Sequence, residues 1–183
     1  MMPPTTGGSI HGQLRRRDDQ MLYLMIKPDP AAAAAMDRLR LDYNLARKYQ
    51  RFHVTLVPFG DIRLISPENL ELIRCALASL QAEPFEVALN RIKGNALVGN
   101  KMQALRDFQR ILVGRLDAFG VQRPDYDFNP HASLTYDEWQ PRNIPVSPIA
   151  WRAERLLLIN SIHGKGHDLI ESWTLEPRQG SLF

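Results

Sequence analysis

The chain has 183 residues, of which 44% are hydrophobic and 23% are charged, and its formal net charge is +3. This mixture is typical of a soluble globular protein and excludes collagen-like, wholly disordered and membrane-embedded chains, since no apolar run approaches the roughly 20 residues that span a bilayer. The single cysteine, Cys75, excludes an internal disulfide and a cysteine-based zinc site, and it is typical of a reducing compartment.

Residues 1–19 contain prolines, glycines and a run of three arginines and two aspartates, but not the apolar stretch of a signal peptide. We therefore expect a flexible leader, a cytoplasmic protein and no membrane partner. Residues 20–183 match the size of one domain at about 150 residues per domain, and we expect that domain to act as a monomer.

The first half of the chain predicts the order strand–helix–strand–helix. Short apolar runs that end at prolines, or that alternate polar with apolar residues, indicate strands. Alanine-rich segments, and serine followed by proline, indicate helices. The expected elements are strands at Met21–Lys27 and Arg51–Phe59, a helix at Ala31–Tyr49, and a second helix that begins at Ser66.

The second half predicts further strands around one long helix. The same patterns place that helix before Gly120, and they place a turn where glycines cluster after a long apolar run. The expected elements are strands at Pro84–Ile92, Ala96–Gly99, Asp127–Tyr136, Trp151–Ile162 and Leu169–Leu175, a helix at Lys101–Phe119, a loop at Asp137–Pro148 and a turn at Gly164–Gly166.

This order predicts an α+β fold built from a duplicated unit. In each half a helix leads into a strand that carries a histidine. Antiparallel sheets with helices on the outside accommodate such an order. We therefore expect a bilobal, pseudo-duplicated domain of mostly antiparallel sheets with a central cleft.

Two related tetrapeptides carry the chemistry: His53-Val54-Thr55-Leu56 and His131-Ala132-Ser133-Leu134. Side chains alternate between the two faces of a strand. Each tetrapeptide therefore presents an imidazole and a hydroxyl on one face and two apolar side chains on the other. One such motif is usually structural, but two copies in a chain of five histidines indicate a site.

Two imidazoles and two hydroxyls suit a phosphodiester substrate. One imidazole takes a proton from the attacking oxygen, and the other gives a proton to the leaving oxygen. The hydroxyls of Thr55 and Ser133 donate hydrogen bonds to phosphate oxygens, where negative charge develops. The acidic residues are scattered along the chain. We therefore expect neither a metal nor another cofactor.

The two motifs resemble those of the 2H phosphoesterase superfamily, and most of all those of the RNA 2′,3′-cyclic phosphodiesterases, also called 2′-5′ RNA ligases. The resemblance runs through Leu22–Asp29, Phe52–Leu56, Phe128–Leu134 and Trp173–Leu175. It implies a bilobal fold and hydrolysis of a 2′,3′-cyclic phosphate, on an RNA end or a nucleotide, to a 2′-phosphate. It also implies that His53 is the general acid and His131 the base.

One position departs from the resemblance. The RNA enzymes often carry an arginine five residues past the second histidine, where this chain has Tyr136. A basic phosphate clamp is therefore either missing or supplied by another residue.

Other side chains are candidates for binding the substrate. Arg51 lies two residues before His53 and is able to pair with phosphate, although an arginine at a strand end is also often solvated. Aromatic side chains stack on bases or pack in a core. The stacking candidates are Tyr23, Phe59 and Tyr136.

Two further segments have more than one interpretation. Lys101 begins a helix, where backbone N–H groups favour anions, but it is equally typical of a surface lysine. The run from His163 to His167 is first a hairpin turn, because of its glycines, and second a metal or phosphate loop.

Three other functions stay open: an RNA- or nucleotide-binding module without turnover, an enzyme acting on 2′-5′ linkages, and an enzyme acting on ADP-ribose cyclic phosphate. Binding alone does not require two imidazoles, so the intact motifs favour an enzyme.

Overall fold

The computed structural model describes residues 19–45, 51–100, 102–136 and 143–176 of the chain. The expected leader, apart from Asp19, and the candidate Lys101 lie outside these residues. No helix in the described part of the chain is long and apolar enough to cross a membrane.

The described strands form two four-stranded antiparallel sheets. The first sheet has the order β2-β1-β7-β8, and the second has the order β5-β4-β3-β6. The strands of the first sheet are β2 (Val54–Asp61), β1 (Gln20–Ile26), β7 (Arg155–Ile162) and β8 (Gly166–Thr174). Those of the second are β5 (Ala132–Ser133), β4 (Ala96–Val98), β3 (Phe85–Lys93) and β6 (Ile144–Ala153).

The helices are α1 (Pro30–Asp42), α2 (Pro67–Ala78) and α3 (Gln103–Ala118), with a short 3-10 helix at Ile62–Leu64. The predicted cap of α2 is present, because the Ser66 hydroxyl accepts from the Asn69 N–H at 3.1 Å. Helix α1 has a similar cap that was not predicted: the Asp29 carboxylate accepts from the Ala32 N–H at 2.7 Å. Pro30 and Pro67 each occupy the first turn, where a missing N–H costs nothing.

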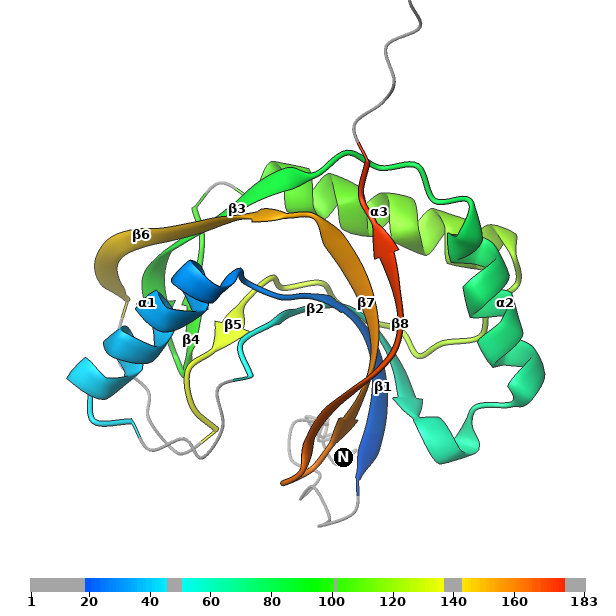
Figure 1. Ribbon diagram of the computed structural model, residues 1–183, viewed down its shortest axis with the longest axis horizontal. Helices are drawn as coiled ribbons and strands as arrows, with labels where there is room; N and C mark the ends of the chain where they lie inside the picture. Colours follow the sequence, from blue (N-terminus) through cyan, green and yellow to red (C-terminus); the bar gives the residue numbers. More distant parts are fainter. Residues whose placement is uncertain (1–18, 46–50, 101, 137–142, 177–183) are drawn as a thin grey trace, which may run out of the picture.

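The fold repeats one unit twice. A helix joins two antiparallel neighbours in each sheet: α1 joins β1 to β2, and α3 joins β4 to β5. Helix α1 contacts β6 of the second sheet, whereas α3 contacts both β3 and β2 (Figure 1). The predicted α+β class with antiparallel sheets and a duplicated unit is therefore confirmed.

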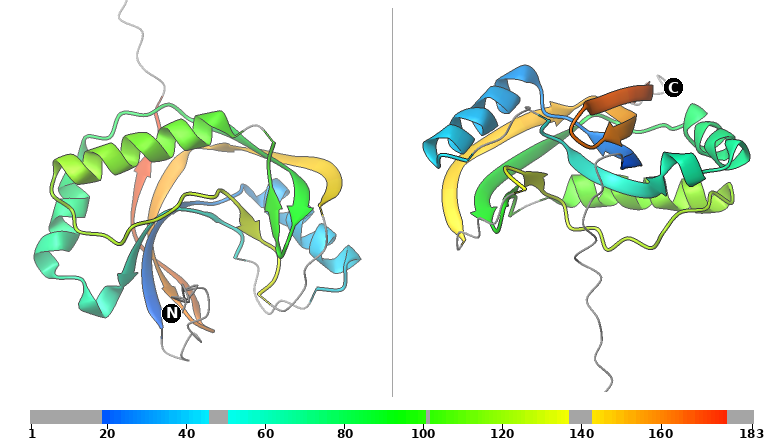
Figure 2. Two further views of the ribbon diagram at one scale, coloured as in Figure 1. Left: turned by 180° about the vertical axis from the view of Figure 1, so that it is seen from behind. Right: turned by 90° about the horizontal axis from the view of Figure 1, so that it is seen from below.

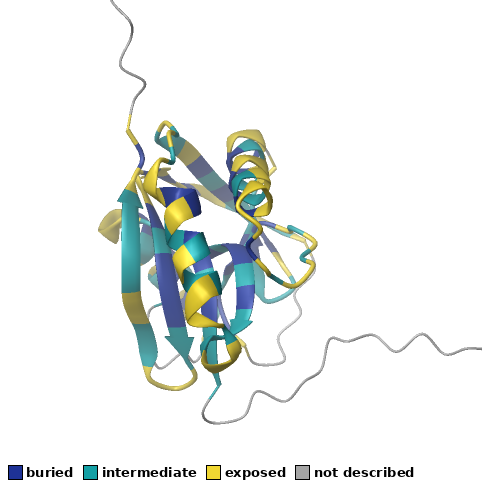
Figure 3. Ribbon diagram, turned by 90° about the vertical axis from the view of Figure 1, so that its right-hand side faces the viewer, coloured by how far each residue is buried: buried dark blue, intermediate teal, exposed yellow. Residues whose placement is uncertain are grey.

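One hydrophobic cluster runs through both sheets. It includes Leu24 and Leu56 of the first sheet and Leu89 and Leu97 of the second, all 0% exposed. Figure 3 shows how buried and exposed positions interleave along the strands and helices. This pattern leaves one face of each sheet for the core and the other face for polar side chains.

The strand predicted at Asp127–Tyr136 was too long, because only Ala132–Ser133 pairs as a strand. Pro130 cannot donate to a ladder, and the N–H groups of Leu134 and Thr135 both point to the carbonyl of Asn95, at 2.9 and 3.4 Å. The second motif is therefore held by a short bridge and a loop.

The loop predicted at Asp137–Pro148 was also wrong in its second half, because β6 begins at Ile144. β6 is an edge strand, where Pro145 and Pro148 remove no essential ladder bond, and its register with β3 shifts beside Pro148. Residues 137–142 lie outside the described part.

The single strand predicted at Trp151–Ile162 is two strands in two different sheets, divided at Glu154. Buried side chains fall at Trp151 and Ala153 and then at Leu156 and Leu158, so the alternation shifts by one residue at the division. The Glu154 carbonyl accepts from the Leu175 N–H at 2.8 Å, which ties the crossover to the end of β8.

Two other predicted element boundaries differ from those in the structure. The predicted helix Ala31–Tyr49 ends at Asp42, because Tyr43 caps it and Asn44 adopts a left-handed conformation with φ of 52°. The final strand begins at Gly166 rather than at Leu169, so it includes His167.

Candidate active site

The first motif lies at the start of β2. Val54 and Leu56 are 0% exposed and face the core, whereas His53 and Thr55 are partly buried on the opposite side. Thr55 pairs with Met25 of β1. We call this side of the first sheet, which carries Tyr23, Met25 and Thr55, the Thr55 face.

The second motif repeats this arrangement at the start of β5. Ala132 and Leu134 are 0% exposed, and His131 and Ser133 are partly buried. Ser133 pairs with Ala96, and Ala96 pairs with Lys93. We call this side of the second sheet the Ser133 face. The alternation predicted from the sequence therefore holds at both motifs.

Each of the two histidines makes the same type of hydrogen bond to the main chain, which the sequence did not predict. His53 Nδ1 lies 2.7 Å from the carbonyl oxygen of Arg51, and His131 Nδ1 lies 2.7 Å from that of Asn129. A carbonyl oxygen only accepts, so each Nδ1 must carry the proton that it donates. In both neutral rings Nε2 is then the acceptor, and in the charged rings it is a donor.

The two motifs come to the junction between the sheets. β2 and β5 are edge strands, and Figures 1 and 2 show the start of β2 beside β5. α3 leads into the second motif and also contacts β2, because the Gln109 side chain donates to the Leu56 carbonyl at 3.4 Å. The element that positions the second motif thus rests on the strand of the first.

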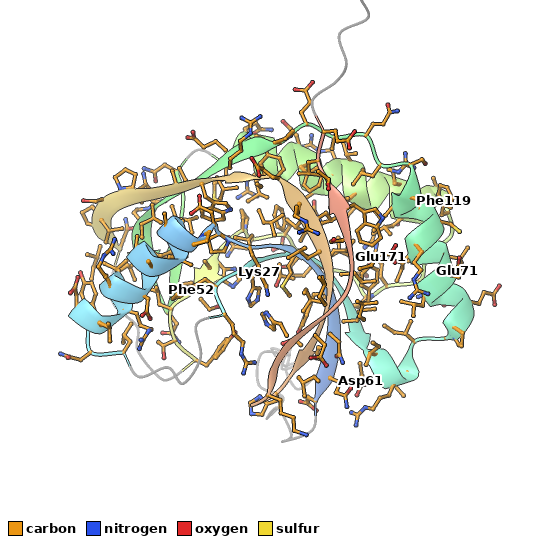
Figure 4. All side chains as sticks on the ribbon, in the orientation of Figure 1. Lys27, Phe52, Asp61, Glu71, Phe119 and Glu171 are labelled. Carbon is orange, nitrogen blue, oxygen red and sulfur yellow. The ribbon has the colours of Figure 1, made fainter. Side chains whose placement is uncertain are left out.

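Two basic side chains lie near the first motif. Arg51 Nη1 is 3.5 Å from the carbonyl oxygen of Ile162, at the end of β7. Lys27 follows β1 by one residue, and alternation from Met25 puts it on the Thr55 face (Figure 4). Burial, and then the positive charge of Arg51, lower the pKa of Lys27 below its ordinary value. This corner is therefore electropositive.

The three stacking candidates have different environments. Tyr23 is partly buried and lies on the Thr55 face. Phe59 is 6% exposed and belongs to the core, and Tyr136 is 65% exposed. Register shifts in the β1–β2 pair place Pro58, rather than Phe59, opposite Tyr23. For Phe59 the structure thus shows the core packing that was the alternative to stacking.

Tyr126 was missed by the sequence analysis. Burial raises the pKa of its phenol, and the neighbouring Tyr23 and Asp127 raise it further. Tyr126 belongs to the segment before β5, so its interaction with Tyr23 links that segment electrostatically to β1.

Arg91 was missed as well. It pairs with Val98 and lies two residues before Lys93, which pairs with Ala96 opposite Ser133, so alternation puts Arg91 on the Ser133 face. The Nε atom of Arg91 is buried and has no hydrogen-bond partner among the described residues. A buried N–H group without a partner is costly unless a ligand completes it.

His167 is the third residue brought to the site only by the fold. The predicted hairpin is confirmed: β7 and β8 are joined by a turn in which Gly164 has φ of 73°. His167 is the second residue of β8, and its ring centroid lies 5.0 Å from that of His53, with the rings at 72°.

Within the described residues no group of three or more His, Cys, Asp or Glu side chains is arranged to hold a metal ion.

Comparison with known proteins identifies the fold. No protein-family model and no curated protein matches the chain. A solved phosphoesterase matches with a TM-score of 0.71 at 16% identity, over 87% of this chain and 100% of its own. Escherichia coli LigT in complex with 3′-AMP matches with a TM-score of 0.69 at 15% identity, over 87% and 99%. The chain has the fold of these two proteins.

A Thermus thermophilus protein has the same fold, with a TM-score of 0.67 at 16% identity over 86% of this chain and 99% of its own. The fold that the sequence resemblance implied is therefore confirmed. At this identity the likeness concerns the backbone, so the roles of the side chains must be argued from this chain.

Proposed function

We propose that the chain is a 2H-type phosphodiesterase that hydrolyses a 2′,3′-cyclic phosphate, on an RNA end or a nucleotide, to a 2′-phosphate. The observation that carries the proposal is the repeated geometry. Two histidines each donate from Nδ1 to a carbonyl two residues upstream, and each is followed by a hydroxyl on the same side of its strand.

The proposed reaction is an in-line displacement at phosphorus by water. Nε2 of His131 takes a proton from the water as its oxygen bonds to phosphorus. The bond from phosphorus to the 3′ oxygen breaks, and Nε2 of protonated His53 gives that oxygen a proton. The products are a free 3′ hydroxyl and a 2′-phosphate, so atoms and charges balance.

The negative charge that develops on the phosphate oxygens needs donors. Thr55 and Ser133 follow the two histidines and are proposed to donate their hydroxyl protons to the non-bridging oxygens. Arg51 supplies positive charge near the first motif, and Arg91 on the Ser133 face is our candidate for the clamp that Tyr136 does not provide.

Nucleotide binding agrees with this proposal. LigT, which shares the fold, was crystallised with 3′-AMP and also with phosphate. Tyr23 is the stacking candidate that we retain for the base, because it lies on the Thr55 face.

The test is a panel of substrates with one enzyme preparation. The panel contains 2′,3′-cyclic nucleotides, an RNA with a cyclic end, a 3′,5′-cyclic nucleotide, 2′-5′ oligonucleotides and ADP-ribose cyclic phosphate, with products assigned by phosphorus NMR. We expect 2′-phosphates from the 2′,3′-cyclic compounds and no product from the 3′,5′-cyclic control. Binding of every compound without turnover would instead show a nucleotide-binding module.

A further inference from the structure

A third imidazole touches the first motif. The rings of His167 and His53 lie 5.0 Å apart between centroids and are nearly perpendicular, at 72°, which is the edge-to-face arrangement of aromatic pairs. His167 is partly buried, and it comes from β8, on the far edge of the first sheet from β2. The hairpin that carries it therefore reaches back to the start of β2.

The same hairpin also meets Arg51. The Ile162 carbonyl is 3.5 Å from Arg51 Nη1, and a Cβ added at Gly166 would lie 4.0 Å from the Arg51 guanidinium carbon. Both ends of the β7–β8 turn thus contact the residues around His53. Because Arg51 also provides the carbonyl that accepts from His53 Nδ1, the hairpin supports the hydrogen bond and the ring together.

We propose that His167 is a positioning residue that packs against His53, holds its ring with Nε2 toward the substrate phosphate, and couples its own protonation to that of His53. This proposal rests on the proposed function. An imidazole at this place does two things that a hydroxyl or an aliphatic side chain does not do together: it packs edge-to-face, and it takes up a proton near neutral pH.

The sign of the coupling follows from the charges around the pair. The charged groups Arg51 and Lys27 lie on the same side of the first sheet as His53, and His131 comes from the second sheet. Asp168, the acidic neighbour of His167, is exposed on the opposite face of β8. A charged His167 repels a charged His53 and so lowers the pKa of His53. Removal of the His167 imidazole is therefore expected to raise the pKa of His53 by about 0.5–1 unit.

The variants separate packing from charge. His167→Ala removes both, and we expect its kcat to fall roughly ten- to a hundredfold, with little change in KM, because a misaligned acid or base acts mainly on the chemical step. His167→Phe keeps a ring but no titrating group, and we expect it to regain most of kcat. His163→Ala is the control, since His163 is exposed at the other end of the same turn.

The pH dependence is the second measurement. In both His167 variants the limb of the kcat/KM profile that belongs to His53 should move to higher pH, and in His163→Ala it should stay in place. His167→Ala with wild-type kcat and an unmoved profile overturns the proposal.

A titration without substrate keeps this test separate from the proposed function. The ring signals of His53, followed by NMR against pH, should report the same upward shift in both His167 variants and none in His163→Ala. If the protein turns over no cyclic phosphate, the proposed function fails, and the titration alone then decides whether His167 and His53 are coupled. An unchanged His53 titration in both His167 variants overturns the coupling.

Discussion

The Nδ1 atoms of His53 and His131 both lie 2.7 Å from a main-chain carbonyl oxygen two residues upstream. A main-chain acceptor needs no particular side chain, so the orientation of each ring depends on the local backbone and on the strand that follows it. Because the same backbone device is used twice, both rings reach the junction with the same nitrogen, Nε2, away from the backbone.

The two histidines are predicted to act as one acid–base unit. His53→Ala and His131→Ala should each lower kcat/KM roughly 10³- to 10⁴-fold, and the double variant should be little worse than the worse single one. The wild-type pH profile should be bell-shaped, because one ring must be neutral and the other charged. The comparison uses one cyclic phosphate, after thermal unfolding has shown that each variant folds. Near-wild-type turnover in either single variant would make that histidine structural.

The hydroxyls are predicted to contribute less than the imidazoles. Thr55→Ala and Ser133→Ala should each lower kcat roughly ten- to a thousandfold, as expected when one donor to developing charge is lost. Thr174→Ala, an exposed threonine of β8, is the matched control and should be neutral. Steady-state kinetics on a cyclic nucleotide measure the effect. Unchanged rates in both motif variants would assign the hydroxyls to packing.

Arg91 is predicted to hold substrate phosphate from the Ser133 face. Arg91→Ala should weaken binding of inorganic phosphate or 3′-AMP roughly tenfold or more, because a charge-assisted hydrogen bond is lost. Arg152→Ala is the control, since Arg152 is an exposed arginine on neighbouring β6. Calorimetric titration measures both. If Arg91→Ala binds as tightly as Arg152→Ala, the clamp must lie elsewhere.

At the scale of elements, the connection from β4 to α3 has almost no spare room. A Cβ at Gly99 would lie 2.3 Å from the Ala88 carbonyl oxygen and 2.9 Å from the Met102 side chain. β4 pairs with β5, so this connection also supports the strand that carries Ser133.

Gly99→Ala is therefore predicted to lower the free energy of unfolding by about 1–3 kcal/mol, because backbone must move. Gly114→Ala is the matched control: Gly114 lies within α3 with no atom within 4 Å of its would-be Cβ, and alanine there should stabilise by about 0.5–1 kcal/mol. Urea unfolding measures both. Equal stability of the two variants would contradict the close approach at Gly99.

At the scale of the whole molecule, two sheets from a duplicated unit bring two edge strands together, and each supplies an imidazole and a hydroxyl. Two imidazoles are sufficient for both proton transfers, so the reaction does not require a metal-bound water.

Turnover is therefore predicted to persist in an excess of EDTA. The measurement compares initial rates on a cyclic phosphate before and after dialysis against the chelator, with a zinc phosphodiesterase as the positive control for chelation. Loss of activity that a divalent cation restores would contradict the metal-independent mechanism.

The sequence by itself determined the class of the fold and the two motifs. Side-chain alternation in the motifs and the helix caps depend on neighbours only a few residues away, so a local sequence pattern is enough to indicate them. The alternating residues are Val54, Leu56, Ala132 and Leu134, and the capping residues are Asp29 and Ser66. The burial of these side chains agrees with that pattern.

Tertiary structure decided the rest. Three features depend on pairing with distant strands. They are the register shifts beside which Phe59 packs into the core, the division at Glu154 between two sheets, and the edge position that lets β6 contain prolines. Arg91 reaches the Ser133 face, and His167 reaches His53, by the same long-range pairing. The interaction of Tyr126 with Tyr23 also joins distant parts of the chain. Some of these contacts join residues more than a hundred positions apart. The spacing of residues along one strand does not indicate which distant strand will pair with it.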